Sequence, residues 1–216
     1  MEKVNNKKNL RKEYVLIAIL LLLFIVLSIF VVGGKTDLFD ERVFNNLIKL
    51  KTSLLSKILY VITNIGSSIG VLLVLGITAF IFMRKKIFSD FKYLIINVGS
   101  GVALMEIIKN IVRRIRPSWK WITQAGFSFP SGHTISAVLL YGTLIMLINK
   151  KLKGKMRIIL TIIFSFMIFL IPVSRIYFGV HYLTDIIGGF ILGAVILLIS
   201  NIFMNKEFNN DKDKIK

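Results

Sequence analysis

Apolar residues occur along the chain in long uncharged blocks, separated by short charged or polar segments. Several blocks reach the roughly 20 residues that a helix needs to cross about 30 Å of hydrocarbon. The block at 91–112 is the least regular, because it holds Lys92, Glu106 and Lys109. The pattern predicts an all-α, polytopic membrane protein with six transmembrane helices. The blocks cover residues 15–32, 58–83, 91–112, 133–149, 158–174 and 186–205.

The first block follows a basic segment, so a cleaved signal peptide has to be weighed against a retained helix. The uncharged stretch from Val15 to Val32 is longer than the usual apolar core of a signal peptide, which has about 7–15 residues. No Ala-x-Ala cleavage site follows it. We therefore expect a retained transmembrane helix.

Clusters of Lys and Arg indicate the orientation, because short cytoplasmic loops carry an excess of these residues. They occur before the first block, at 84–92, at 150–157 and after the last block, and six spans bring these regions to one side. We predict a multi-pass plasma-membrane protein with a cytoplasmic segment 1–14, a six-helix membrane domain 15–205 (core about 60–205) and a cytoplasmic tail 206–216. The connections 33–57, 113–132 and 175–182 then face outward. The first of them is expected to hold a short amphipathic helix.

Composition narrows the classes of partner. The chain has 216 residues, is 55% hydrophobic and carries a formal net charge of +18. A nucleic-acid-binding domain would place such charge on a soluble face, whereas here it lies between apolar blocks, where it suits anionic lipid headgroups. We therefore expect the membrane, and no nucleic acid, as partner. The absence of cysteine excludes disulfides, thiolate metal ligands and a cysteine nucleophile.

Three polar segments lie at the predicted outer ends of the spans. The third span leads into the first segment, the fourth span begins in the second, and the fifth and sixth spans flank the third. All three segments should therefore converge on one face of the membrane. They read KNIVRRIRP (109–117), PSGH (130–133) and SRIYFGVHYLTD (174–185), and they contain the only two histidines of the chain.

The residue types in these segments suit phosphoryl transfer. His181 and Asp185 are four residues apart, so they share a face in the first turn of a helix, and a carboxylate beside an imidazole fixes its tautomer. His133 follows a predicted helix start, where free N–H groups favour an anion. One histidine can attack phosphorus while the other protonates the leaving group. Three cations can hold the phosphate oxygens: Lys109, Arg116 and Arg175.

A metal-dependent mechanism fits these segments less well. Phosphatases with two metal ions need several carboxylate or histidine ligands around ions roughly 4 Å apart. Only Asp185 is well placed for this, with Glu106 more remote. We expect no metal and no other cofactor, with the cationic side chains neutralising the phosphate instead.

The three segments resemble, in residue type, spacing and order, the signature motifs of the phosphatidic acid phosphatase type 2 superfamily. These membrane lipid phosphatases are related to vanadium haloperoxidases, and the resemblance covers roughly residues 60–205. It implies a catalytic core like the haloperoxidase helical bundle and a metal-independent phosphatase. It implies His181 as the nucleophile that forms a phosphohistidine, Asp185 as its partner and His133 as the general acid. The phosphate-binding residues implied are Lys109, Arg116, Ser131, Gly132 and Arg175.

The substrate implied by the resemblance is a lipid phosphate or diphosphate at the outer membrane surface. Undecaprenyl diphosphate, phosphatidylglycerophosphate and phosphatidic acid all fit, because the motifs recognise phosphate and not the tail. A transporter or lipid-binding protein that uses the cations for binding alone is the alternative from another class. Retention of both histidines and Asp185 argues for the enzyme.

Several residues near the motifs have competing interpretations. Glu106 either orients the first cation of the motif or is an interfacial residue without a role. Arg113 and Arg114 match no signature position and are expected to face headgroups or solvent. Trp119 and Trp121 suit an interfacial aromatic belt, with contact to a substrate headgroup as the alternative. Three glycines of the last block suit close helix packing: Gly188, Gly189 and Gly193.

Overall fold

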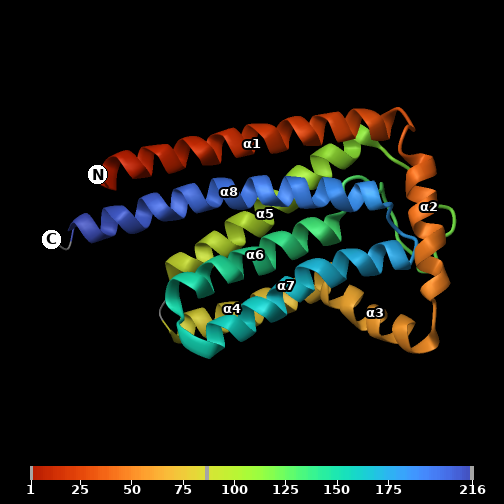
Figure 1. The fold of residues 1–216 in the computed structure, drawn as a ribbon. Coiled ribbons are helices and arrows are strands. Elements are labelled where there is room, and N and C mark those ends of the chain that lie inside the picture. The colour runs from red at the N-terminus through yellow and green to blue at the C-terminus, as the bar shows by residue number, and fades with distance from the viewer. Residues whose placement is uncertain (1, 86–87, 215–216) are drawn as a thin grey trace.

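The computed structural model describes residues 2–85 and 88–214, and this part of the chain is all-helical, as the sequence predicts. Its long helices run roughly along one direction, while α2 lies across one end of the bundle (Figure 1). The helices are α1 (Glu2–Val32), α2 (Asp37–Leu47), the 3₁₀ turn η1 (Ile48–Leu50), α3 (Ser53–Ile65), α4 (Ser68–Arg84), α5 (Phe88–Val112), α6 (Gly132–Lys151), α7 (Gly154–Tyr177) and α8 (Leu183–Lys214).

The helices are long and apolar enough to support the predicted number of spans. Five of them pass by length and composition alone, and a bent pair, α3 with α4, makes a sixth. Large side chains such as Val32, Ile77 and Phe169 are exposed on the outer faces of the bundle, as lipid contact requires. The second predicted span, 58–83, differs from the prediction, because it is two helices that meet at 60° and not one continuous helix.

Small residues explain the break between α3 and α4. The Ser67 hydroxyl caps α4 by accepting from Gly70 N–H at 3.2 Å. A Cβ at Gly66 would lie 2.3 Å from Cγ2 of Ile171, and one at Gly70 would lie 2.3 Å from the Asn64 carbonyl oxygen. Glycine at position 70 therefore permits the bend, and glycine at position 66 lets the end of α3 lie close to α7.

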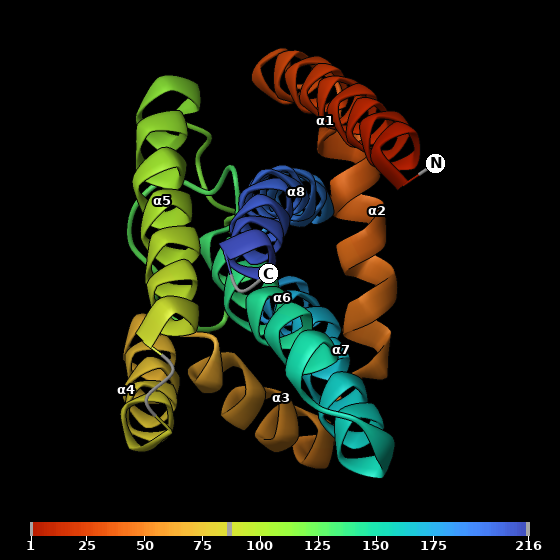
Figure 2. The ribbon, with the colours of Figure 1, turned by 90° about the vertical axis from the view of Figure 1, so that its left-hand side faces the viewer.

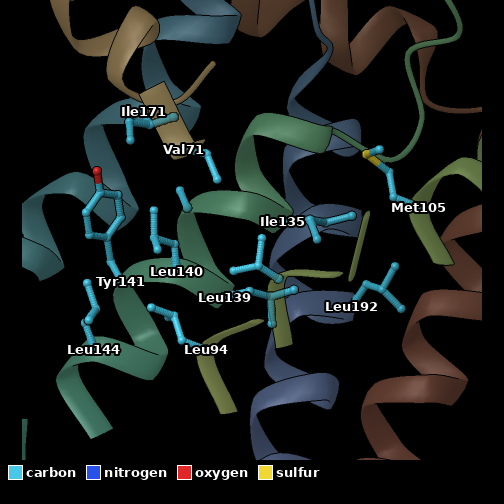
Figure 3. Close-up of a cluster of buried hydrophobic side chains, with 12 residues drawn as sticks. Val71, Leu94, Met105, Ile135, Leu139, Leu140, Tyr141, Leu144, Ile171 and Leu192 are labelled. Carbon is cyan, nitrogen blue, oxygen red and sulfur yellow. The ribbon is translucent and has the colours of Figure 1, made fainter. Parts of the chain in front are cut away.

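Helix α6 forms the centre of the bundle and is packed by α5, α7 and α8. Viewed along the helices, α6 and α8 lie inside the ring formed by the others (Figure 2). Figure 3 shows Ile135, Leu139 and Leu140 of α6 among side chains of α4, α5, α7 and α8, and all three are fully buried. As expected, glycines allow α8 to lie close to α6, since a Cβ at Gly193 would come within 2.7 Å of Val138.

The two ends of the bundle carry different segments. The beginning of α1 and the ends of α4, α6 and α8 lie at one end in Figure 1, while α2, the 113–131 loop and the α7–α8 turn lie at the other. The amphipathic helix expected in 33–57 is α2. The three motif segments therefore meet at the end of the bundle that α2 crosses.

Candidate active site

The three motifs surround one cavity of about 530 Å³ at this end of the bundle. It is lined by five of the predicted site residues: Lys109, Arg116, Gly132, His133 and His181. A second cavity of about 640 Å³ adjoins the first at His133 and is lined by Arg175. Ser131 and Asp185 line neither cavity and are fully buried. The structure thus brings together side chains that lie up to 76 positions apart in the sequence.

His181 and Asp185 form a buried pair at the beginning of α8. Nδ1 of the imidazole lies 3.2 Å from Oδ2 of the carboxylate, and the same oxygen accepts the Tyr182 N–H at 3.0 Å. On the other side of the ring, Nε2 lies 3.0 Å from Nη1 of Arg116. A guanidinium can only donate, so Nε2 accepts and carries the lone pair, while Nδ1 carries the proton and donates to Asp185. This is the tautomer that a nitrogen nucleophile needs.

Burial, together with the neighbouring cations Arg116 and Arg175, lowers the pKa of His181 well below its usual value. The imidazole is only 3% exposed, and water cannot stabilise its charged form there. His181 is therefore neutral near pH 7. The neutral imidazole lines a cationic cavity, and its Nε2, whose lone pair accepts from Arg116, is the atom suited to attack on an anionic phosphorus centre.

The Arg116 guanidinium is held rigidly next to His181. It donates to the Gly126 and Phe127 carbonyls at 2.9 and 3.1 Å and to the Val180 carbonyl at 2.8 Å. These bonds tie the 125–127 loop and the chain before His181 to one positive charge. Burial lowers the pKa of Arg116, with Asp185 acting in the opposite direction.

Arg175 lies in the last turn of α7 and is only 2% exposed. Its Nη1 donates to Thr63 Oγ1 at 2.7 Å and its Nη2 to Gln124 Oε1 at 2.6 Å. Its buried Nε has no partner among the described residues. The guanidinium is therefore held in place from two sides. Gln124, which the sequence did not single out, lines both cavities.

Lys109 and Gly132 both line the first cavity and lie close to each other. A Cβ at Gly132 would be 2.5 Å from Met105 Sδ and 3.8 Å from Lys109 Nζ, so the missing side chain leaves room beside the cation. Glu106 lines the same cavity. Its side chain is exposed, three residues before Lys109 on α5.

Ser131 precedes α6 and lines neither cavity. Its Oγ caps α6 by accepting from Thr134 N–H at 3.4 Å, and its own N–H donates to the Asp185 carbonyl at 3.0 Å. The residue is fully buried. In this structure Ser131 joins the beginning of α6 to the beginning of α8, and so positions His133 relative to His181.

Two neighbouring arginines behave differently. Arg113 is exposed, as expected, and ends α5 with a positive φ of 50°. The expectation for Arg114 is wrong, because its side chain is only 8% exposed and is enclosed by three carboxylates. Its Nη1 lies 2.9 Å from Asp185 Oδ1, and its Nη2 lies 2.8 Å from Asp40 Oδ2 and 3.1 Å from Asp37 Oδ1. Nearby carboxylates outweigh burial and raise the pKa of Arg114.

The tryptophans of the 113–131 loop attach it to its surroundings. Trp119 stacks on Phe44 of α2 with ring centroids 5.1 Å apart and meets Tyr182 edge-on at 5.9 Å. Trp121 packs against Tyr177 at 5.6 Å and lines the second cavity. Trp119 therefore holds α2 over the site, and Trp121 is placed to contact a molecule in the second cavity.

These features define a helical membrane protein with a cationic pocket built around a His–Asp pair. Residues 91–209, more than half of the chain, match the family model described as the PAP2 superfamily, and the protein belongs to this superfamily. Resemblance to it had been inferred from the three motifs, and the match confirms that inference. The matched residues include all three motifs but not α1 to α4.

Two curated relatives cover most of the chain. A phosphatidylglycerophosphatase B of Bacillus subtilis (strain 168) is 28% identical over 191 residues, which are 87% of this chain and 94% of the relative. An undecaprenyl-diphosphatase of Sulfolobus acidocaldarius is 27% identical over 193 residues, with 84% and 88% covered. Both relatives are phosphatases of lipid phosphates by name.

Solved structures share the fold. The crystal structure of a transmembrane PAP2-type phosphatidylglycerolphosphate phosphatase from Bacillus subtilis matches with a TM-score of 0.80 at 28% identity, covering 88% of this chain and 96% of that one. Aquifex aeolicus LpxE matches with a TM-score of 0.61 at 25% identity, covering 74% and 92%. Together with the candidate spans, these likenesses identify a multi-pass membrane protein.

Proposed function

We propose that this protein is a membrane lipid phosphatase that hydrolyses a lipid phosphate or diphosphate through a phosphohistidine at His181, without a metal ion, on the outer face of the membrane. The observation that carries the proposal is the state of the imidazole. Nδ1 is bonded to Asp185, while Nε2 keeps its lone pair beside Arg116 at 3.0 Å and next to the cavity.

The first step forms a bond from Nε2 of His181 to phosphorus and breaks the bond from phosphorus to the leaving oxygen of the lipid. His133, on the wall of the same cavity, donates a proton to that oxygen. Asp185 stabilises the positive ring by accepting from Nδ1. In the second step, water attacks the phosphohistidine, His133 takes its proton, and inorganic phosphate leaves with Nε2 regenerated.

The cations around the cavity supply the electrostatic stabilisation. Lys109, Arg116 and Arg175 can hold the non-bridging oxygens, and the free N–H groups at the beginning of α6, near Gly132, add donors. Removing one such preoriented donor typically costs about 10²- to 10³-fold in turnover.

The donor set favours chemistry without a metal. Among the described residues, no three His, Asp or Glu side chains gather with the geometry of a metal site. The carboxylate nearest to the nucleophile, Asp185, is already engaged by His181 and Arg114. Fixed guanidinium groups take the place that Mg²⁺ has in metal-dependent phosphatases.

The relatives guide the choice of lipid. One is named for phosphatidylglycerophosphate and another for undecaprenyl diphosphate, so both are substrate classes for this chain, with phosphatidic acid as a third. A cavity at the end of a helical bundle with an apolar surface admits a phosphate while the tail stays in the bilayer. Enzyme activity, and not binding alone, follows from the preserved His181–Asp185 pair and His133.

The test is phosphate release by detergent-purified protein over a panel of these three lipids, in EDTA. We expect release from at least one lipid, no stimulation by Mg²⁺, and loss of release in His181→Ala. A requirement for added metal would contradict the metal-free mechanism. Full activity in His181→Ala would contradict the role of His181 as the nucleophile. Binding of all three lipids without phosphate release would favour the alternative function, a lipid-binding protein or transporter.

A further inference from the structure

Asp40 of α2 is a buried carboxylate that none of the motifs contains. It is 1% exposed, although the residues around it on α2 are largely exposed. Its Oδ1 accepts the Thr184 N–H at 3.0 Å, and its Oδ2 accepts from Thr184 Oγ1 at 2.6 Å and from Arg114 Nη2 at 2.8 Å. It lies outside residues 91–209 that match the family model.

Arg114 links this carboxylate to the catalytic pair. Nη1 of the guanidinium contacts Asp185 Oδ1 at 2.9 Å and Thr184 Oγ1 at 2.7 Å, while Nη2 contacts Asp40. The guanidinium also lies over the Tyr182 ring, 3.8 Å from its centroid. A planar fork bonded at both nitrogens and stacked on a ring has little freedom to turn.

The link decides which way the Asp185 carboxylate faces. Its Oδ1 is occupied by Arg114, so its Oδ2 is the oxygen left to accept from His181 Nδ1 and the Tyr182 N–H. Both Asp40 and Asp185 have fully buried side chains, and one guanidinium lies between them. If Arg114 lost its bond to Asp40, its Nη2 would keep only Thr36 Oγ1 and the exposed Asp37 as partners, and the guanidinium would hold Asp185 Oδ1 less firmly.

We propose that Asp40 is a positioning residue that orients Asp185 toward His181 through Arg114 and Thr184. The position of α2 across the end of the bundle thereby affects the rate of turnover. Figure 1 shows α2 in this position, across the ends of α7 and α8. The inference rests on the proposed phosphatase function. Asp40 touches neither cavity, so it affects the rate through the catalytic pair and not through contact with the substrate.

The test compares Asp40→Asn with Asp37→Asn. Asp37 is the matched control, because it is on the same helix and contacts the same Nη2 at 3.1 Å, but its side chain is 63% exposed. We expect Asp40→Asn to lower kcat by about tenfold to a hundredfold, the range found when outer partners of metal-bound histidines are removed. KM and inhibition by orthovanadate should change less than about threefold. Asp37→Asn should keep kcat within about twofold.

A double-mutant cycle separates positioning from simple stabilisation. In an Asp185→Asn background, Asp40→Asn should lower kcat no further, because the carboxylate it orients is gone. Melting in detergent reports on folding independently. An equal proportional loss of kcat in both backgrounds would show a merely structural role, and an unchanged kcat in Asp40→Asn would overturn the proposal.

Two controls keep these outcomes distinct. If Asp40→Asn does not fold, Asp40→Glu, which keeps the charge but moves the oxygens, enters the same cycle with the same criteria. Wild-type protein and His181→Ala are assayed beside the variants. No release by wild type overturns the phosphatase function itself, whereas active wild type with an equally active Asp40 variant overturns only the positioning role.

Discussion

The charges around His181 determine how its reactivity depends on pH. Burial, and then Arg116 and Arg175, lower the pKa of this imidazole well below its usual value. Because the group is a base, a lowered pKa means that its neutral, nucleophilic form persists as the pH falls below about 6.5, the value of an unperturbed histidine. The nucleophile is therefore lost only in more acidic solution.

Replacing Arg116 tests this electrostatic effect. Arg116→Gln removes the positive charge 3.0 Å from Nε2, so the pKa of His181 should rise and the acid limb of kcat/KM should move to higher pH than in wild type. Arg116→Lys keeps the charge and serves as the control, with the acid limb near its wild-type position. The pH profiles of all three proteins are measured on the same lipid, so the titration of the substrate phosphate affects each profile equally. If the acid limbs of Arg116→Gln and wild type coincided, the effect of the Arg116 charge on the pKa of His181 would be contradicted.

Spacing in the sequence predicted which residues meet, but not how each is used. The i, i+4 interval of His181 and Asp185 predicted their contact from one helical turn. The contact is present, although α8 begins only at Leu183 and His181 precedes the helix. The contacts of Arg114 could not be predicted from spacing, because a charged residue at the end of a span suits the lipid headgroups as well as a buried ion pair. The burial of Arg114 depends on Asp40, 74 residues earlier, which only the folded chain brings to it.

At the level of helices, the break between α3 and α4 shapes the wall of both cavities. Ser68, at the beginning of α4, lines the first cavity and the second. The sequence predicted one span over 58–83, because an uncharged block gives no sign of an interruption. The close approach of Gly70 to the Asn64 carbonyl is a property of the bend itself.

Two glycines of α4 give a matched test of the bend. In Gly70→Ala, the added Cβ would lie 2.3 Å from a backbone oxygen, so the bend must open, and we expect a loss of about 1–3 kcal/mol in stability with lower activity. In Gly76→Ala, the Cβ would meet nothing within 4 Å, and melting should change little. Melting in detergent and phosphate release measure both. Equal melting temperatures for the two variants would show that the bend is not strained by a side chain.

Across the whole molecule, the site lies at the end of the bundle opposite to the beginning of α1 and the end of α8 (Figure 1). The family, the all-α class and the number of spans were predicted from the apolar blocks and the motifs, because both signals are local in sequence. Loop charge then predicts that the site faces outward, with both termini cytoplasmic. The crossing of α2 over the site is a tertiary feature that no local pattern indicated.

The orientation can be measured in this cysteine-free chain. Ser118→Cys, in the 113–131 loop, and Lys155→Cys, at the beginning of α7, both introduce exposed thiols. We expect an impermeant thiol reagent to label Ser118→Cys in intact cells and Lys155→Cys only after lysis. The reverse pattern would place the site on the cytoplasmic side.

The central claim is that phosphate passes through His181, and trapping the phosphoenzyme tests it most directly. Purified protein is mixed with a labelled lipid phosphate in EDTA, quenched in alkali within a single turnover, and digested for mass spectrometry. The account predicts an acid-labile phosphate on the peptide that carries His181, and no such phosphopeptide in His181→Ala. Turnover without this phosphopeptide, or with phosphate on another residue, would contradict it.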